Sequence, residues 1–585
     1  MSEDILKRFE QLSEEKQKLL EMLMEEEAIY VAPRTPIEES LAKIWSQVLG
    51  VKQVGIHDNF FELGGDSLQS IQIVAKAHQL GLDFNSSQLF EYPTIAEIIT
   101  IVNTSQIHQA QQEPVIGLIP LTPIQHWFFE QNFPEASYWN QSVLLEIKPG
   151  QSPNLLKEAC QQLLIHHDAL RLRFEKIAGT WKQINQDIGE KLSFSQFDLS
   201  KYTQTEQTSA ITKIANELQS SLNLLQGPMM KVAFFNLGSE QPSRLLLIFH
   251  HLTEDAFSLR IILEDLQMLY QQLSRGETIN LPPKTTSFQQ WSCLLREYAQ
   301  SPELKQELAY WLPQSQLPVS RLPVDYAKGT NTEDSSRIFS VSLTPEETCT
   351  LLQEVPKAFH TEINEVLMAS AAIAISEWVG TNNLLIDLEG HGREEIIPGV
   401  DLSRTVGFFT SVFPVYLNIS NYQNLNDVLM IVKKQLRQIP KRGIGYGLLR
   451  YICEDKTEVE KLFKAPSAEI IFNYLGQFDR VFNEYSLFKL ATESHGATHS
   501  PRGHRSHLLQ IMGKVMAGKL QMSWIYSENI HHQTTIEKLA KRFLETLKAL
   551  IEHSKSINMP CFTPSDFPEA ELSQDQLFKL LNKNI

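Results

Sequence analysis

Three short stretches of the chain carry side chains whose types and spacing suit covalent attachment or proton transfer. "FFELGGDSLQS" places Ser67 directly after two glycines and an aspartate. "FHHLTED" sets two histidines at the end of an apolar run, with Asp255 four residues after the second. "IDLEGHGREE" holds Glu389 among glycines. A hydroxyl is an attachment point, whereas histidine and carboxylate side chains commonly exchange protons in catalysis.

The hydroxyl of Ser67 is predicted to lie at the start of a helix. Gly64 and Gly65 accept backbone angles that other residues avoid, and Asp66 and Ser67 follow them directly. A helix start offers unpaired N–H groups and the positive end of the helix dipole, and both favour a phosphate on the serine. For a lone GGDS, a simple helix cap is the alternative interpretation.

The chain has three histidine pairs, and one of them suits catalysis best. His166-His167 ends a helical stretch, where the dipole favours a histidine cap. His531-His532 precedes "QTTIEK" and is expected on an exposed approach to a helix. Only His250-His251 follows five consecutive apolar residues and has an acid at the fourth place, which favours His251 as a proton-transfer residue. The alternative is a core histidine with Asp255 as a helix cap. With no HExxH and no CxxC motif, no metal site is predicted.

The composition indicates a globular protein of several domains. The 585 residues are too many for one core, and hydrophobic residues make up 42% and charged residues 21%. A net charge of -17 without a Lys/Arg-rich cluster argues against nucleic acid or an anionic membrane as a partner. The scattered cysteines, the lack of a signal-like apolar core at the N-terminus and the shortness of every apolar stretch predict a cytoplasmic location.

The positions of the three stretches depend on the elements around them. Apolar residues at helical spacing, with a capping box from Thr94 to Glu97, predict a small helical domain. Further along, strand-like and helical runs alternate, which indicates an α/β domain, and a turn-rich stretch divides it into two lobes. The predicted organisation is a helical lead-in or docking segment at 1–29, the helical domain at 30–104, a linker at 105–118, two lobes at 119–285 and 286–556, and a further linker at 557–585.

The region from 30 to 103 resembles a thiolation, or peptidyl carrier, domain of a nonribosomal peptide synthetase. The resemblance rests on the GGDS motif together with the surrounding helices. It implies a four-helix domain in which Ser67, next to Asp66, carries a covalent 4′-phosphopantetheine arm. The thiol of that arm holds an aminoacyl or peptidyl group, and a phosphopantetheinyl transferase is the implied partner that attaches it.

The region from 119 to 554 resembles the condensation superfamily, whose fold is a two-lobed, chloramphenicol-acetyltransferase-like α/β domain. "HHLTEDAFS" is similar to the HHxxxDG motif, with Ala256 where the family has glycine. "DLSRTVGFFTSVFPVYL" resembles an epimerization motif, with Phe408 in place of the usual tryptophan, and "IFNYLGQFD" is similar to a later one. The whole chain therefore resembles a carrier–epimerization didomain.

This resemblance implies inversion of the α-carbon of a thioester-bound amino acid, from L to D. A thioester carbonyl makes the α-proton removable, and a proton returned to the other face of the planar enolate inverts the centre. Proton-transfer groups on the two faces, or one group with water, are required, together with donors to the enolate oxygen. His251 and Glu389 are the implied proton-transfer groups, and Asn473 and Tyr474 the candidate donors.

Three further residues are predicted to support the site without touching the substrate. His250 and Asp255 are interpreted as structural parts of the HHxxxD motif. A buried carboxylate needs a partner of opposite charge, and Arg393 is predicted to pair with Asp255.

Two other functions are kept as alternatives. One is a bond-forming condensation domain of the same fold, and the other is a catalytically inactive module that only handles the carrier. The chain resembles neither an adenylation domain nor any part of one, so an upstream adenylation domain or module and a downstream condensation domain are the expected partners. The sequence does not name the amino acid, nor does it distinguish aminoacyl from peptidyl substrates or one-base from two-base chemistry.

Overall fold

The computed structural model describes residues 30–102 and 110–557, apart from 240, 421 and 478–485, together with 563, 566 and 576. The lead-in predicted at 1–29, the first part of the linker at 105–118 and most of the linker at 557–585 lie outside the described residues. Within the described part of the chain, no helix is long and apolar enough to cross a membrane.

The first domain contains the four helices that the sequence predicts. They are α3 (Pro36–Leu49), α4 (Ser67–Gln79), α5 (Ser86–Glu91) and α6 (Ile95–Ile101). Each begins at a polar cap, and the capping box predicted from Thr94 to Glu97 is present at α6. Helix α3 ends at Gly50, whose left-handed φ of 64° a glycine adopts without strain.

A glycine sets the approach to α4. A Cβ atom on Gly65 would lie 2.5 Å from the ring of Phe60, which is fully buried in the core of the first domain. Only glycine therefore lets this loop pack on Phe60. The packing places Asp66 and Ser67 at the start of α4.

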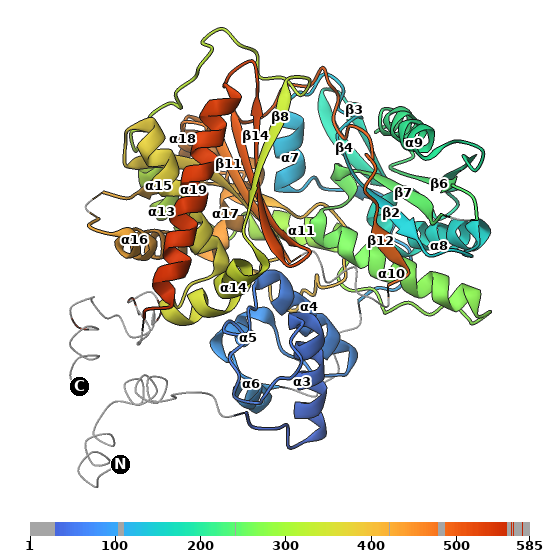
Figure 1. Cartoon of the computed structure of the whole chain (residues 1–585), viewed down its shortest axis with the longest axis horizontal. Helices are drawn as coiled ribbons and strands as arrows, with labels where there is room; N and C mark the ends of the chain where they lie inside the picture. The colour runs from blue at the N-terminus through green and yellow to red at the C-terminus, as the bar shows by residue number, and fades with distance from the viewer. Residues whose placement is uncertain are drawn as a thin grey trace.

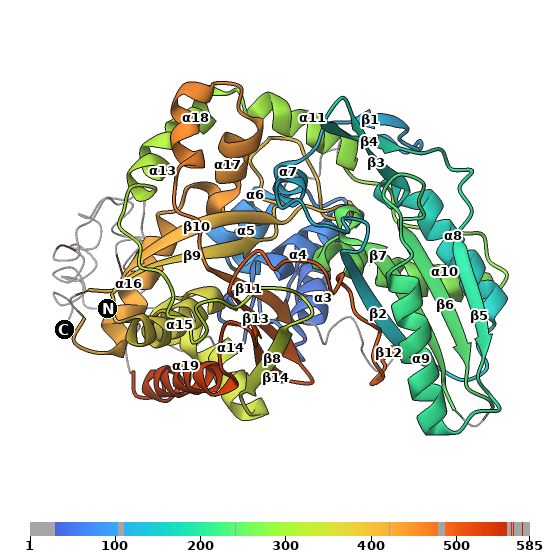
Figure 2. The ribbon, with the colours of Figure 1, turned by 90° about the horizontal axis from the view of Figure 1, so that it is seen from above.

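The second domain contains two main sheets, which lie side by side in Figure 2. The five-stranded sheet has the order β12 (Phe488–Leu490), β2 (Asn140–Ile147), β7 (Ser243–His250), β6 (Met230–Asn236), β5 (Ser193–Asp198). Its accompanying helices are α8 (Pro153–His166), α9 (Gln204–Gln219) and α10 (Ala256–Ser274). Strand β7 contains the five apolar residues before the second histidine pair, and all five are buried.

The six-stranded sheet has the order β10 (Ser411–Asn418), β9 (Asn383–Gly390), β11 (Ile470–Gln477), β13 (Leu509–Met516), β14 (Lys519–Ser527), β8 (Ser336–Ser342). Four helices lie on the side of the molecule that holds the six-stranded sheet (Figure 1): α14 (Pro345–Phe359), α15 (Ile363–Val379), α16 (Leu425–Arg437) and α19 (Gln533–Ser554). Strand β11 runs parallel to β9 and β13, whereas the other neighbours are antiparallel.

The remaining elements lie around and between the two main sheets. A three-stranded sheet has the order β1 (Gly117–Ile119), β4 (Thr180–Asn185), β3 (Leu172–Ile177). The other α-helices are α7 (Pro123–Glu130), α11 (Phe288–Tyr298), α12 (Pro302–Gln306), α13 (Leu308–Gln314), α17 (Ile444–Gly447) and α18 (Lys456–Phe463).

The predicted division of the second domain at residues 285 and 286 does not separate the two sheets completely. Strand β12 comes from the C-terminal part of the chain but pairs antiparallel with β2, at the edge of the five-stranded sheet. An isolated β-bridge between Trp139 and His499 is a second pairing between the N-terminal and C-terminal parts of the domain. The edge of β2 is thus covered by a segment remote in sequence, which local patterns do not reveal.

Candidate functional site

His251 lies immediately beyond the end of β7, in a short 3₁₀ turn (His251–Thr253). Its Nδ1 atom lies 2.8 Å from the backbone carbonyl oxygen of Glu254. Because a carbonyl oxygen only accepts hydrogen bonds, Nδ1 carries a proton and donates it there. The nitrogen that could exchange a proton in catalysis is therefore Nε2, which lies 2.9 Å from the side-chain amide of Gln141.

Aromatic rings enclose the imidazole of His251. The ring of Trp139 stacks on it with centroids 4.6 Å apart, and the ring of Phe408 lies 4.5 Å away. Burial lowers the pKa of His251, although the nearby Asp255 carboxylate and the backbone contact oppose this. The phenylalanine that replaces the usual tryptophan therefore directly contacts the predicted catalytic histidine.

Both ring nitrogens of His250, predicted to be structural, are engaged in hydrogen bonds. The side chain is fully buried, and Nε2 donates to the carbonyl oxygen of Ala136 at 2.8 Å. Its Nδ1 accepts from the backbone N–H of Leu252 at 3.2 Å. Burial lowers the pKa of His250 to about 3. With both ring nitrogens engaged, this imidazole holds the turn in place as a neutral group.

Asp255 connects three parts of the second domain. It caps α10 by accepting from the backbone N–H of Ser258 at 2.7 Å, and it accepts from the N–H of Phe409 at 3.0 Å. The pairing predicted with Arg393 is present, with Asp255 Oδ1 and Arg393 Nη2 3.5 Å apart and both side chains buried. Ala256 is the first residue of α10, so the glycine of the family motif is not required at this turn.

Replacing Asp255 with alanine is expected to lower the free energy of unfolding by about 3–5 kcal/mol, because it leaves Arg393 buried without a carboxylate. Chemical denaturation measures this loss. Glu264→Ala is the control, since Glu264 forms a half-exposed ion pair with Arg404 and such pairs contribute about 1 kcal/mol or less. Equal stability of the two variants would contradict the role given to Asp255.

Glu389 lies on β9, and Asn473 lies on the neighbouring strand β11. The Asn473 amide donates to Glu389 Oε2 at 2.5 Å. Burial raises the pKa of the Glu389 carboxyl to about 7, with a smaller contribution from Asp387, while the hydrogen bond from Asn473 opposes the rise. A carboxyl group with a pKa near neutrality both accepts and releases protons readily, which suits a general acid or base.

Tyr474 follows Asn473 on β11. Successive side chains of a strand point to opposite faces of the sheet, so Tyr474 lies on the face opposite Asn473 and Glu389. That face carries Phe472, whose cross-strand neighbours lead to Trp524, and the Trp524 ring contacts Phe543 of α19. The pleat of β11 thus separates the two side chains, and the role of Tyr474 as a donor to the substrate stays a prediction.

One extended segment links the two proton-transfer candidates. Phe408 contacts His251, and Val412, four residues further along, is the cross-strand partner of Glu389. Four residues span at most about 14 Å, so His251 and Glu389 approach the two ends of one short segment. A cavity lies along it and is lined by residues that include Phe408, Phe409, Thr410, Ser411, Val412 and Trp127.

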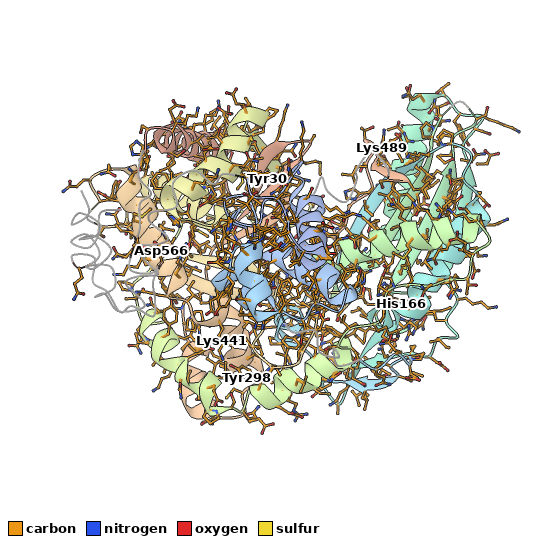
Figure 3. All side chains as sticks on the ribbon, turned by 90° about the horizontal axis from the view of Figure 1, so that it is seen from below. Tyr30, His166, Tyr298, Lys441, Lys489 and Asp566 are labelled. Atoms are coloured by element: carbon orange, nitrogen blue, oxygen red, sulfur yellow. The ribbon has the colours of Figure 1, made fainter. Side chains whose placement is uncertain are left out.

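The first domain lies against the second with Ser67 at the contact. Arg442 Nη1 donates to Ser67 Oγ at 2.9 Å, and Arg442 also pairs with Glu362 at 2.8 Å. Figure 3 shows the first domain in front of the second, with Lys441, the neighbour of Arg442, labelled beside it. A helix start and a guanidinium at the same hydroxyl fit an attached phosphate, as a phosphopantetheine arm on Ser67 would require.

Strand β11 leads from this contact to Glu389. Gln477, at its C-terminal end, donates to the carbonyl oxygen of Gly64 at 3.3 Å, four residues beyond Asn473. Other contacts hold the first domain nearby: His78 lies 3.3 Å from Asp401, and Glu395 accepts from the backbone N–H of Ser86 at 2.6 Å. The serine and the candidate proton-transfer site are therefore connected through a single strand.

The other two histidine pairs differ from the sequence interpretation. His167 is more than a helix cap: it is buried, and its Nε2 lies 3.0 Å from Asp265. His531, expected on an exposed approach, is fully buried, and only His532 is exposed. His166, His167 and Asp265 could in principle hold a cation. Asp265 already pairs with Arg404, and the absence of a metal stays a prediction.

Sequence reasoning missed three residues that contact the predicted site. Gln141 and Glu254 lie at His251, and Arg442 lies at Ser67. Glu254 stands inside the HHxxxD motif at a position that the motif leaves open. Gln141 and Arg442 carried no recognisable local signal, apart from the turn residues "KRG" around Arg442.

Comparison with known proteins gives two family matches. A model described as a condensation domain matches residues 115–573. A model described as a phosphopantetheine attachment site matches residues 39–102.

Curated relatives are long proteins of which this chain spans only a small part. A linear gramicidin synthase protein of Brevibacillus parabrevis is 46% identical over 554 residues, which are 93% of this chain and 7% of the relative. Surfactin synthase subunit 2 of Bacillus subtilis (strain 168) is 40% identical over 564 residues, which are 95% of this chain and 15% of the relative.

Among solved structures, the epimerization domain from the third module of tyrocidine synthetase B has a TM-score of 0.73 and 36% identity. The match covers 77% of this chain and 99% of that one. The X-domain from teicoplanin biosynthesis has a TM-score of 0.61 over 76% of this chain and 97% of that one. Its 17% identity indicates a shared fold alone.

Proposed function

Because this chain belongs to the condensation-domain family and has a phosphopantetheine attachment domain in front of that domain, we propose that it epimerizes the α-carbon of an aminoacyl or peptidyl thioester. The covalent 4′-phosphopantetheine of the first domain supplies the thiol of the thioester, whose carbonyl makes the α-proton acidic. Ser67 is the proposed attachment residue. The second domain supplies the groups that move the proton.

Glu389 and His251 are the proposed proton-transfer residues. The α-proton leaves to one of them, and the other returns a proton to the opposite face of the α-carbon. Glu389 accepts a proton when its carboxyl is ionised, and His251 exchanges protons at Nε2. Asn473 holds the Glu389 carboxylate in place, while Trp139 and Phe408 exclude water from His251.

One observation carries the proposal: a second titratable group, Glu389, accompanies His251 at the same segment of the second domain. Its pKa of about 7 makes it suited to proton transfer at neutral pH. A bond-forming condensation domain or an inactive module would not require this carboxyl group. The similarity to an epimerization domain of tyrocidine synthetase B also supports the proposal.

Uptake of deuterium at the α-carbon tests the function. The first domain is loaded with an L-aminoacyl-pantetheine in deuterated buffer, the thioester is hydrolysed, and the enantiomers are separated. We expect a mixture of L and D forms with deuterium at the α-carbon, and a similar mixture when the D form is loaded. Absence of deuterium uptake from both enantiomers, across several verified loaded amino acids, would favour the inactive module instead.

The same proposal implies three kinds of partner. A phosphopantetheinyl transferase modifies Ser67, an upstream adenylation domain or module supplies the amino acid, and a downstream condensation domain receives the epimerized product. The curated relatives are synthase subunits, which is consistent with a place among other modules.

A further inference from the structure

Gln141 bridges His251 and a buried carboxyl group that the proposed mechanism does not use. One terminal atom of the Gln141 amide lies 2.9 Å from His251 Nε2. The other terminal atom lies 3.1 Å from each carboxyl oxygen of Glu254. Glu254 is fully buried, and Gln141 belongs to β2, which pairs with β7. The two titratable groups thus contact the two ends of one amide.

The charge on Glu254 determines which way this amide faces. An ionised carboxylate only accepts hydrogen bonds, so it turns the NH₂ group of Gln141 toward itself and the amide oxygen toward His251 Nε2. That oxygen then accepts the Nε2 proton. A protonated Glu254 donates instead to the amide oxygen, which turns the NH₂ group toward a neutral Nε2.

We propose that Glu254, acting through Gln141, is a positioning residue that holds His251 in its protonated form. The inference rests on the proposed function, in which one proton-transfer group must carry a proton when the other is ionised. The imidazolium and the carboxylate stabilise each other across the amide, so the buried site stays neutral overall. The charged pair holds as many protons as a neutral His251 with a protonated Glu254. His251 then has a proton to donate to the α-carbon, and that donation leaves the pair with one proton fewer until His251 takes up another.

Burial opposes the charged forms of both groups, because it lowers the pKa of His251 and raises the pKa of Glu254, so the proposed charge pair depends on the contacts made through Gln141. Burial and the neighbouring Asp255 raise the pKa of Glu254 well above its ordinary value, so an ionised Glu254 needs a nearby cation. Arg393 is already paired with Asp255. The other titratable groups at His251 are His250 and His499, and burial lowers the pKa of each. A protonated His251 is the group positioned to balance Glu254.

Glu254→Gln tests the proposal without a change of shape. The new amide carries no charge and donates to the Gln141 oxygen, so we expect His251 to lose its proton at a pH about one unit lower or more. Gln141→Met removes the bridge and should shift the titration in the same direction. In the Gln141→Met background, Glu254→Gln should add little, because the two residues act as one unit.

Two measurements follow the proton on His251. The first is the pH titration of the His251 ring in the unloaded protein by NMR with labelled histidine, assigned by its loss in His251→Ala. The second is the pH dependence of α-deuterium uptake in the loaded protein. Glu307→Gln is the matched control: Glu307 is also a buried carboxyl group, but it contacts Trp311, and its replacement should not move the His251 titration.

The outcomes distinguish the proposed action of Glu254 on His251 through Gln141 from the proposed function. The proposal is overturned if the His251 titration is unchanged in a folded Glu254→Gln variant. It is also overturned if Glu307→Gln shifts the His251 titration as much as Glu254→Gln does. A rate lowered equally at all pH values also overturns it, because that indicates a purely structural effect. If Glu254→Gln does not fold, the shift in Gln141→Met decides alone. If the wild type shows no deuterium uptake, the proposed epimerase function is rejected. The NMR titration still tests whether Glu254 keeps His251 protonated.

Discussion

Replacing His251 with alanine is expected to slow α-deuterium uptake by about 10²–10⁴-fold, the usual contribution of a positioned acid or base. The expectation rests on geometry: Nδ1 is occupied by the Glu254 carbonyl oxygen, so Nε2 is the nitrogen that exchanges the proton. The rate is measured on the loaded protein from each enantiomer separately. A folded His251→Ala variant that retains the wild-type rate would exclude this histidine from the reaction.

His532→Ala is the matched control, because His532 belongs to another histidine pair and is exposed. Its rate should stay within a small factor of the wild type. His167 is a poorer control, since the buried contact with Asp265 means that its loss also affects folding.

The companion change, Glu389→Gln, keeps the shape of the side chain but removes the proton acceptor. In the wild type, the rate from at least one enantiomer should fall as the pH drops through about 7, because the Glu389 carboxyl is then protonated and no longer accepts a proton. The glutamine variant should lose that dependence along with the rate. If the two residues serve opposite faces, the two variants will differ in which enantiomer they still deprotonate.

Replacing Ser67 with alanine is expected to abolish attachment of the phosphopantetheine arm completely, and with it all epimerization of carrier-bound substrate. The physical reason is the loss of the attacking hydroxyl at the start of α4. Incubation with coenzyme A and a phosphopantetheinyl transferase, followed by intact-mass measurement, should show one added arm in the wild type and none in Ser67→Ala.

Ser87→Ala is the control for that experiment. Ser87 is an exposed serine in the first turn of α5, so it shares the helix-start position without the preceding glycine pair. It should accept the arm as the wild type does. Modification that survives in Ser67→Ala would place the attachment elsewhere.

The sequence by itself indicated which residue types could carry the chemistry and which elements hold them. The GGDS stretch, the second histidine pair and the EGHGRE stretch were recognisable because each joins a reactive side chain to a local pattern: a glycine loop, a buried strand or a glycine-flanked carboxylate. Helical spacing and caps predicted three helices of the first domain, whereas α5 was expected from the family resemblance alone. The pair between Asp255 and Arg393 followed from the general need of a buried charge for a partner.

Only the tertiary structure decided which side chains meet. The pleat of β11 directs Asn473 toward Glu389 and Tyr474 toward the opposite face of the sheet. The sequence "NY" alone does not show which of the two residues faces Glu389. His531 is buried despite its polar surroundings in the sequence. Gln141 reaches His251 because β2 pairs with β7 in one particular register, and Arg442 reaches Ser67 because two domains pack together. Such contacts depend on strand register and on surfaces formed by distant segments, so the local order of residues that defines helices and strands does not specify them.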